Sequence, residues 1–250
     1  MRLNIDAYLG RIGYAGPRTP TAETLRNLHL QHMLSVPFEN LDIGRRPIAM
    51  DERAFVRKVV DERRGGFCYE LNGAFGALLR ELRFSVVNLS AGVARAEGGF
   101  GPEYDHLALL VDDKWLADVG FGEGFMLPLR FEVDVDQTDP AGVCRITRDG
   151  EYYMLHRNGK PEYRFLLAPH ALVEYAARCN FHQTSPESSF TRGSVCSLAT
   201  KNGRITLANG RLIETKSGQR TERDVSDDER EQVLREVFGV AVRFSAPSTG

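Results

Sequence analysis

The chain has 250 residues, of which 42% are hydrophobic and 26% charged, a mixture typical of folded globular proteins rather than disordered or fibrous ones. Its 34 acidic and 32 basic residues give a formal net charge of -2, which excludes the strong positive charge of a dedicated nucleic-acid binder. No apolar run approaches the length of about 18 residues that a membrane-spanning helix needs, and the N-terminus lacks the apolar stretch of a secretory leader. We therefore expect a cytoplasmic protein that binds neither membrane nor nucleic acid.

The cysteines predict neither a disulfide framework nor a zinc site, because none of them pairs in a C-x-x-C spacing. His29 and His32 lie three residues apart in a helical pattern, but no third ligand stands beside them, so we expect no bound metal. A cysteine with a function would act here as a free thiol. The four cysteines are Cys68, Cys144, Cys179 and Cys196.

Residues 1–83 carry helical patterns. One helix is expected from about Thr21, and it ends before Pro37 because proline disfavours helical backbone in the residue that precedes it. A second helix opens at Asp51, where acidic residues occupy the first turn and interact favourably with the helix dipole. The clearest helix starts near Cys68 and places a set of apolar residues on one face: Leu71, Phe75, Leu78, Leu79 and Leu82.

Between residues 84 and 184 the pattern changes to short strands. Residues 107–111 and 115–119 flank a polar turn at 112–114 and predict a hairpin. A run of short antiparallel strands after a helical block favours a β-sandwich or barrel. Further strands are expected at 86–93, 143–147, 152–156 and 163–167, and a helix at 169–181.

A polar run opens the third unit, residues 185–250. A helix over 224–238 closes this unit, capped by Ser226 or Asp227 and stopped at Gly239. The last six residues are expected to be disordered. Strands joined by Asn-Gly turns are expected at 195–199, 204–208 and 211–215.

Cys68 has the most informative surroundings. Gly65 and Gly66 allow a close backbone approach just before it, and the helix that starts there would lower the pKa of the thiol through its dipole. The alternative is that Cys68 packs as a small hydrophobic residue, as free cysteines often do.

His106 and Asp118 lie on the two strands of the predicted hairpin and would suit the base and the orienting acid that a nucleophilic thiol needs. Each also has an ordinary interpretation, as a strand-edge histidine and a turn-initiating carboxylate. The two side chains share a face only if the loop between the strands has an odd number of residues or a β-bulge restores the phase. The three-residue turn at 112–114 meets this condition, and it places Ala108 opposite Asp118 and His106 diagonal to it.

Three glycines follow Asp118 closely, at positions 120, 122 and 124. A glycine-rich turn can direct backbone N–H groups at phosphate oxygens, so Gly120, Gly122 and Gly124 are candidates for contact with a phosphate-bearing ligand. A nucleotide-binding P-loop is not supported, because no Gly-Lys-Ser/Thr motif appears. A tight turn is the ordinary alternative.

Together these segments resemble the arylamine N-acetyltransferase family. The stretch RGGFCYELN at 64–72 resembles the active-site signature of that family. Four further segments resemble its other blocks in the same order: VPFENL at 36–41, Asp105-His106, DVGFG at 118–122 and SPESSF at 185–190.

The resemblance implies an α+β fold with an N-terminal helical bundle (1–83), a central antiparallel β-barrel (84–184) and a C-terminal α/β lid (185–250). It implies a papain-like triad with Cys68 as nucleophile, His106 as base and Asp118 as its orienter. Acetyl-CoA would be the donor, and an aromatic amine, hydrazine or hydroxylamine the acceptor.

Aromatic side chains would line the acceptor slot in such an enzyme, with plain core packing as their alternative role. The candidates are Phe38, Tyr69, Phe125 and Phe190.

Three other functions stay open at this point. An amide synthase on the same scaffold would close a macrolactam from a carrier-bound polyketide with the same triad. A cysteine hydrolase of papain or transglutaminase type would release free acetate from acetyl-CoA. A binding module would keep Cys68 only as a packed side chain.

Overall fold

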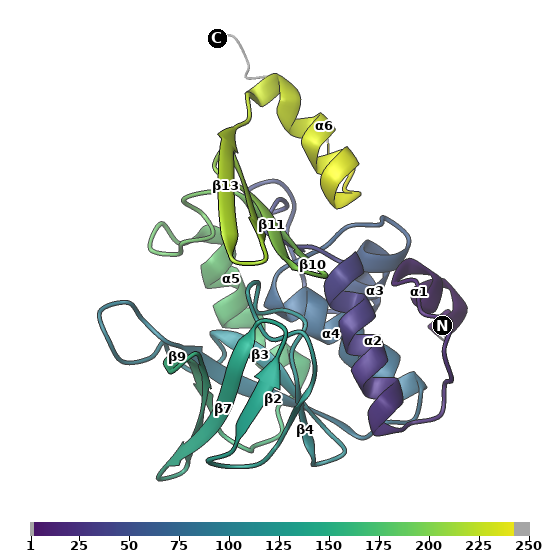
Figure 1. Ribbon diagram of the computed structural model, residues 1–250, viewed down its shortest axis with the longest axis vertical. Helices are drawn as coiled ribbons and strands as arrows, with labels where there is room; N and C mark the ends of the chain where they lie inside the picture. The colour runs from purple at the N-terminus through teal and green to yellow at the C-terminus, as the bar shows by residue number, and fades with distance from the viewer. Residues whose placement is uncertain (1–2, 243–250) are drawn as a thin grey trace.

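The computed structural model describes residues 3–242 of the chain. At its N-terminal end, four helices pack together on one side of the molecule (Figure 1). Each begins where a side chain satisfies free backbone N–H groups: Asn4, Thr21 and Asp51 cap the first three, and Glu70 reaches back to the Phe67 N–H in the fourth. The helices are α1 (Ile5–Arg11), α2 (Ala22–Ser35), α3 (Glu52–Val60) and α4 (Cys68–Glu81).

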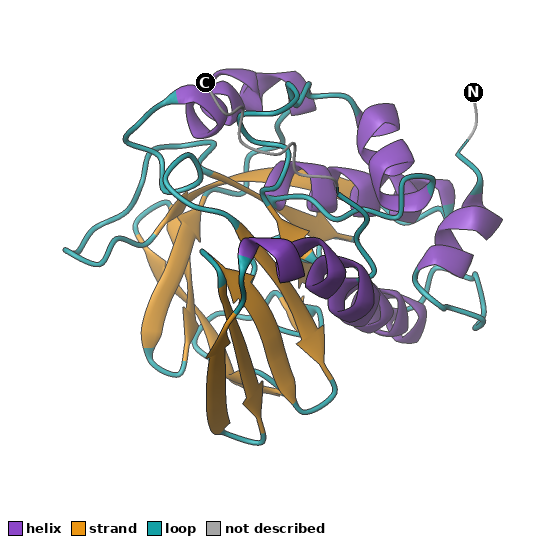
Figure 2. Cartoon of the chain, turned by 90° about the horizontal axis from the view of Figure 1, so that it is seen from above, coloured by secondary structure: helices purple, strands orange, loops and turns teal. Residues whose placement is uncertain are grey.

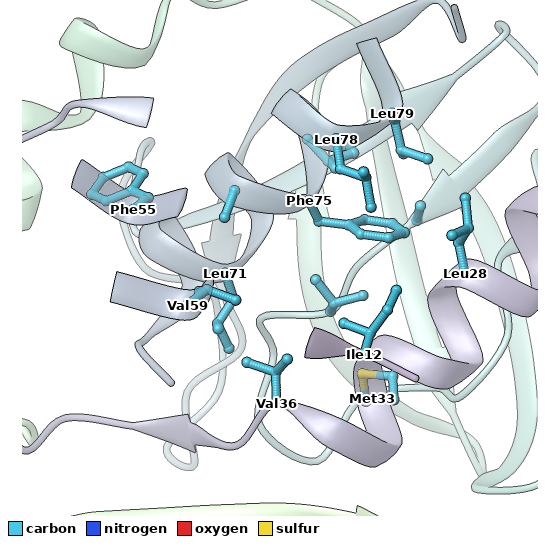
Figure 3. Packing of buried hydrophobic residues seen from close by; sticks show 14 of the residues in the cluster. Ile12, Leu28, Met33, Val36, Phe55, Val59, Leu71, Phe75, Leu78 and Leu79 are labelled. Carbon is cyan, nitrogen blue, oxygen red and sulfur yellow. The ribbon is translucent and has the colours of Figure 1, made fainter. Parts of the chain in front are cut away.

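The expected apolar face of α4 forms the centre of the helical core. Phe75 points toward Leu28 of α2, with Ile12 and Met33 close by (Figure 3). Leu71, Phe75, Leu78 and Leu79 have no exposed surface. This packing fixes the orientation of α4, and therefore also the position of its first residue.

Eight antiparallel strands form a barrel-like sheet at the lower left in Figure 1, beside the four helices, in the order β5-β4-β3-β2-β9-β8-β7-β6. The two end strands are joined through Gln137 on β6, whose amide group donates to the Arg130 carbonyl (2.9 Å) and accepts from the Arg130 N–H (2.8 Å). A side chain thus takes the place of a strand pair at the seam. The strands are β2 (Val86–Val93), β3 (His106–Val111), β4 (Trp115–Ala117), β5 (Leu129–Arg130), β6 (Asp136–Asp139), β7 (Gly142–Asp149), β8 (Tyr152–Arg157) and β9 (Lys160–Phe165).

The hairpin of β3 and β4 confirms the predicted odd loop. Val111 pairs with Trp115 and Leu109 with Ala117, so three residues form the turn and no bulge interrupts the ladder. Asp112 and Asp113 take positive φ angles of 52° and 55°, which carboxylate side chains tolerate better than most. Continued by one pair, this register sets Asp118 opposite Ala108.

A second sheet, of five strands in the order β1-β10-β11-β12-β13, lies at the C-terminal end and carries α6 (Asp227–Phe238). Its first strand comes from the helical part of the chain, since Phe38 pairs with Ser197 and Glu39 with Cys196. Seen from above, helices line one side of the molecule and the strands fan out on the other (Figure 2). The remaining elements are β1 (Phe38–Glu39), η1 (Leu172–Tyr175), α5 (Ala176–Thr184), β10 (Val195–Thr200), β11 (Gly203–Ala208), β12 (Arg211–Lys216) and β13 (Gln219–Asp224).

The structure corrects several expected boundaries. The helix expected at 169–181 is a 3-10 turn followed by α5, which runs on to Thr184. The closing helix starts at Asp227 and not at Asp224, because residues 219–224 form the edge strand β13. All six residues of β13 are exposed, so the sequence shows no alternation of apolar and polar positions there. Helix α1 and strands β1, β5 and β6 were not predicted, and all have seven residues or fewer. The expected disordered tail lies outside the described residues.

We propose residues 1–83, 84–184 and 185–250 as three structural units, because the type of element changes near each boundary. The fold is α+β, as expected. Among residues 3–242, no helix is both long enough and apolar enough to cross a membrane.

Candidate active site

Cys68 is the first residue of α4 and is 4% exposed. The loop before it lies directly against the chain near β1: the Glu39 N–H donates to the Gly66 carbonyl at 2.8 Å. A Cβ atom on Gly65 would lie 1.9 Å from the Pro37 carbonyl oxygen, so only glycine fits there. The two glycines therefore set how closely the start of α4 approaches β1.

A buried ion network lies behind the start of α4. Lys58 of α3 contacts Asp42 and Glu70, each at 2.7 Å, and Arg64 contacts Glu39 at 2.7 Å and Asp42 at 3.0 Å. Arg46 also contacts Asp42, at 2.8 Å, from a more exposed position. Burial raises the pKa of Glu70 to about 7, although the Lys58 charge opposes this increase. For Asp42, burial also acts to raise the pKa, but the charges of Lys58 and Arg64 outweigh it and lower the pKa to about 2.

His106 and Asp118 form a buried pair, with His106 Nε2 2.7 Å from Asp118 Oδ2. The other carboxylate oxygen, Oδ1, accepts from the Asn72 amide (2.8 Å) and from the Gly120 N–H (2.9 Å). Burial alone would favour the neutral acid, but His106 and these hydrogen bonds hold the pKa of Asp118 below its usual range. The ionised form of Asp118 is therefore favoured beside the imidazole.

Asn72 joins α4 to the hairpin that carries His106 and Asp118. It lies four residues after Cys68, on the same face of α4, and donates to the Leu107 carbonyl (2.6 Å) as well as to Asp118. Its carbonyl oxygen accepts from the Val119 N–H at 2.9 Å. A Cβ atom on Gly120 would lie 2.8 Å from both the Cys68 Cα and the Asn72 amide nitrogen. Glycine at 120 thus lets the end of the β3–β4 hairpin close against Cys68.

The pKa of Cys68 differs from the expectation based on its helix start. Burial raises the pKa of the thiol well above its ordinary value, opposed by a hydrogen bond from the Leu107 backbone. The helix dipole by itself therefore does not produce a thiolate. A thiolate at this position would require a nearby group that takes up the proton.

His29 supports Asp118 from the opposite side. Its Nε2 accepts from the Asp118 N–H at 3.1 Å, and its Nδ1 donates to the Met126 carbonyl at 2.9 Å. Burial lowers the pKa of His29, which favours the neutral ring that this arrangement needs. The sequence did not identify His29 or Asn72 as supports of Asp118, because their partners lie at least 35 residues away along the chain.

Two of the four predicted slot residues meet beside the nucleophile loop. The rings of Phe38 and Phe190 have centroids 6.1 Å apart, and both are half-buried. Tyr69 is fully buried and packs against Phe67 (5.0 Å), so it lies behind this surface rather than on it.

Phe125 does not belong to the slot: it is 1% exposed and lies in the barrel core, stacked on His29. Phe121, which the sequence did not single out, is half-buried and meets the His106 ring edge to face at 5.1 Å. Phe121 lies between two glycines of the DVGFG segment. Its position in that motif could have identified it as a candidate site residue.

The three glycines play different roles. The Gly120 N–H is engaged by Asp118, which removes it as a free donor for a phosphate. Gly122 has a φ of +75° and packs near Phe38, while Gly124 lines a cleft of about 500 Å³ between the barrel and the second sheet. Arg157, Lys201 and Arg204 line the same cleft, together with Glu123.

The other three cysteines are buried and free, each in a strand or helix core. Within residues 3–242, no group of three or more histidine, cysteine or acidic side chains is placed to hold a metal ion.

The sequence is similar to characterised acyl-transfer proteins along almost its full length. A family model described as N-acetyltransferase matches residues 21–246. The chain is 34% identical to the arylamine N-acetyltransferase of Escherichia coli K12, over 95% of this chain and 89% of that protein. It is 28% identical to proansamycin X synthase of Amycolatopsis mediterranei, over 92% of this chain and 95% of that protein.

Solved structures show the same similarity. The arylamine N-acetyltransferase of Salmonella typhimurium superimposes with a TM-score of 0.89 at 33% identity, over 96% of this chain and 92% of that one. The Mycobacterium marinum arylamine N-acetyltransferase in complex with CoA gives a TM-score of 0.87 at 29% identity, over 95% of this chain and 93% of that one.

Proposed function

The chain belongs to the arylamine N-acetyltransferase family and is an acetyl-CoA-dependent acyltransferase, and from this premise we propose that it acetylates aromatic amines, hydrazines or hydroxylamines through an acetyl-cysteine at Cys68. The observation that carries the proposal is the 2.7 Å contact between His106 and Asp118, closed against the N-terminus of α4. In this arrangement Cys68 is the nucleophile, His106 the base and Asp118 the residue that orients the base.

The first half-reaction forms the acetyl-enzyme. His106 takes the Cys68 proton, and the sulfur attacks the thioester carbonyl of acetyl-CoA. The Cys68 and Tyr69 N–H groups precede the first intrahelical bond, from the Leu71 N–H to the Phe67 carbonyl, and are the candidate donors to the oxyanion. The bond between the acetyl group and the CoA sulfur then breaks, and the departing sulfur receives the proton from His106.

The second half-reaction transfers the acetyl group to nitrogen. The acceptor amine attacks the acetyl-cysteine carbonyl, His106 removes a proton from that nitrogen, and the carbon–sulfur bond to Cys68 breaks. Phe38, Phe121 and Phe190 would bound the acceptor ring, since all three are half-buried near the nucleophile or its base. This half-reaction returns the thiol and the imidazole to their starting state.

Coenzyme A would lie with its phosphates toward the cleft that Gly124 lines. Arg157, Lys201 and Arg204 supply positive charge there, which suits a pyrophosphate. Gly122 packs near Phe38, since a Cβ atom there would lie 3.7 Å from the Phe38 ring. Gly120 would contribute by close packing on Cys68 and not by binding phosphate, since Asp118 accepts its N–H.

Intact-protein mass spectrometry after incubation with acetyl-CoA tests the proposal. One acetyl group should be added to the wild type and to Cys144→Ala, a control in the barrel, but not to folded Cys68→Ala. Initial rates with an arylamine at several fixed acetyl-CoA concentrations should give parallel double-reciprocal lines, because an acetyl-enzyme separates the two half-reactions. Intersecting lines would contradict the intermediate. Release of free acetate at a rate that the amine leaves unchanged would favour a hydrolase.

A further inference from the structure

We propose that His182 is a positioning residue for the side of the acceptor site that Phe190 forms, called here the Phe190 wall. It acts through a hydrogen-bonded relay that runs from Asp105 through His182 and Ser188 to Phe190. The inference rests on the proposed function, since it assigns to α5 the selection of the acceptor in the second half-reaction. His182 is on α5 and is 7% exposed, and its two ring nitrogens contact residues that lie outside its own helix.

The hydrogen bonds of the relay have one consistent direction. Asp105 Oδ1 accepts from Arg178 Nε (2.7 Å) and lies 3.1 Å from His182 Nε2. Burial opposes ionisation of Asp105, but His182 and Arg178 hold its pKa below the usual range, so the carboxylate accepts and His182 Nε2 carries the proton. His182 Nδ1 is then free to accept from the Ser188 hydroxyl, 3.2 Å away.

Ser188 links His182 to the backbone of Phe190 by a second hydrogen bond. Its hydroxyl oxygen accepts from the Phe190 N–H at 3.2 Å, and Ser188 is only 3% exposed. The Phe190 ring packs against the His182 ring at 5.3 Å and also contacts Phe38 at 6.1 Å. The imidazole therefore supports both the backbone and the ring of a residue proposed to bound the acceptor.

An apolar side chain at position 182 could fill the same space, but it could form neither of these hydrogen bonds. Most buried polar atoms have hydrogen-bond partners, and the two ring nitrogens of His182 find theirs in different parts of the chain. Asp105 precedes the proposed base, and Ser188 belongs to the lid segment. Asp105 also forms an ion pair with Arg178, and this pair does not involve His182. Changes at His182 should therefore move the Phe190 wall and leave His106 in place.

Three substitutions at position 182 separate the two hydrogen bonds. His182→Gln can donate to Asp105 in place of Nε2, His182→Asn can accept from Ser188 in place of Nδ1, and His182→Leu keeps most of the volume and makes neither bond. Asn180→Ala, on an exposed position of α5, is the matched control.

We expect His182→Leu to raise the KM for an aromatic amine by about fivefold to tenfold, as the loss of one or two buried hydrogen bonds predicts. The two polar variants should fall between Leu and wild type. The rate of acetyl-enzyme formation, measured without acceptor, should stay within about twofold of wild type, because His106 and Cys68 keep their partners. The KM for a small hydrazine without a ring should not change, since it does not reach the Phe190 wall.

The outcomes distinguish this inference from the proposed function. An unchanged aromatic-amine KM in all three variants, with normal acetylation of Cys68, would overturn the role of His182 and leave the proposed function intact. An equal rise for ringless and aromatic acceptors, or slower acetylation of Cys68, would also overturn it, because a general structural role would then explain the effect. If His182→Leu does not fold, Ser188→Ala provides the same comparison from the other end of the relay.

Discussion

Asp118 has no exposed surface and accepts hydrogen bonds from a histidine, an asparagine and a backbone N–H. A carboxylate in a strand would be costly to bury alone, and these partners offset that cost. The thiol of Cys68 has the opposite balance, since burial raises its pKa and only the Leu107 backbone opposes this. At the scale of residues, the candidate site therefore combines a stabilised carboxylate with a thiol whose burial favours its neutral form.

The alkylation rate of Cys68 as a function of pH tests this balance. In the wild type we expect reaction with iodoacetamide to persist well below the pKa of about 8.5 of a free thiol, because the proton moves to His106. In His106→Gln the base is lost and burial alone acts, so the apparent pKa should rise above that of a free thiol. Identical profiles for the two proteins would contradict the thiolate–imidazolium pair.

At the scale of elements, the packing of α4 fixes the orientation of the helix, and this fixes the positions of both Cys68 and Asn72. Cys68 and Asn72 lie on neighbouring turns, and the ion network of Lys58 and Glu70 holds the helix start from behind. Glu70 is the member of this network with a raised pKa, because burial raises it to about 7 although the Lys58 charge lowers it.

Unfolding as a function of pH tests the role of Glu70. Its pKa is raised from 4.5 to about 7, so the folded chain binds this proton more tightly than the unfolded chain. The stabilisation is complete below about pH 4.5 and is lost as the pH rises through about 7. Relative to Glu70→Gln, which does not titrate, the free energy of unfolding of the wild type should fall by on the order of 2 kcal/mol across that range.

Urea unfolding at several pH values measures this difference. Glu62→Gln is the control, because that side chain is partly exposed and lies outside the buried part of the network. A wild-type stability that runs parallel to that of Glu70→Gln from acid to neutral pH would show that Glu70 stays ionised throughout.

At the scale of the whole molecule, Asn40 joins the helical part of the chain to the lid. Its amide nitrogen donates to the carbonyls of Phe190 (3.0 Å) and Gly193 (2.7 Å), and its oxygen accepts from the Val195 N–H (2.7 Å). These partners are at least 150 residues away along the chain. One buried side chain thus holds the segment that carries Phe190 and starts β10.

Asn40→Ala should lower the free energy of unfolding by on the order of 3 kcal/mol, because it leaves buried backbone groups without partners. Limited proteolysis should become faster within residues 185–194, the segment that loses its contacts. Asn202→Ala, at an exposed hairpin turn, should change neither measurement. A stable Asn40→Ala protein with an unchanged cleavage pattern would show that β1 and β10 hold the lid without it.

The sequence by itself determined the local features of this protein. Apolar periodicity located α2 and α4, and acidic residues in the first turn located α3. Asn-Gly pairs located the turns that flank β11, and the parity of the turn at 112–114 put His106 and Asp118 on one face of the hairpin. These predictions succeeded because backbone geometry over a few residues decides them. Strand β1 escaped because its partner β10 lies far away along the chain, and β13 escaped because its exposed residues show no alternation of apolar and polar positions.

Tertiary structure alone decided which side chains meet around those features. It brought His29 and Asn72 to Asp118, moved Phe125 into the barrel core and Phe121 beside His106, and raised the pKa of Cys68, where the helix start had predicted a lower one. The physical reason is common to all of these: burial and long-range contacts are set by how the elements pack, and packing leaves no local signal in the sequence.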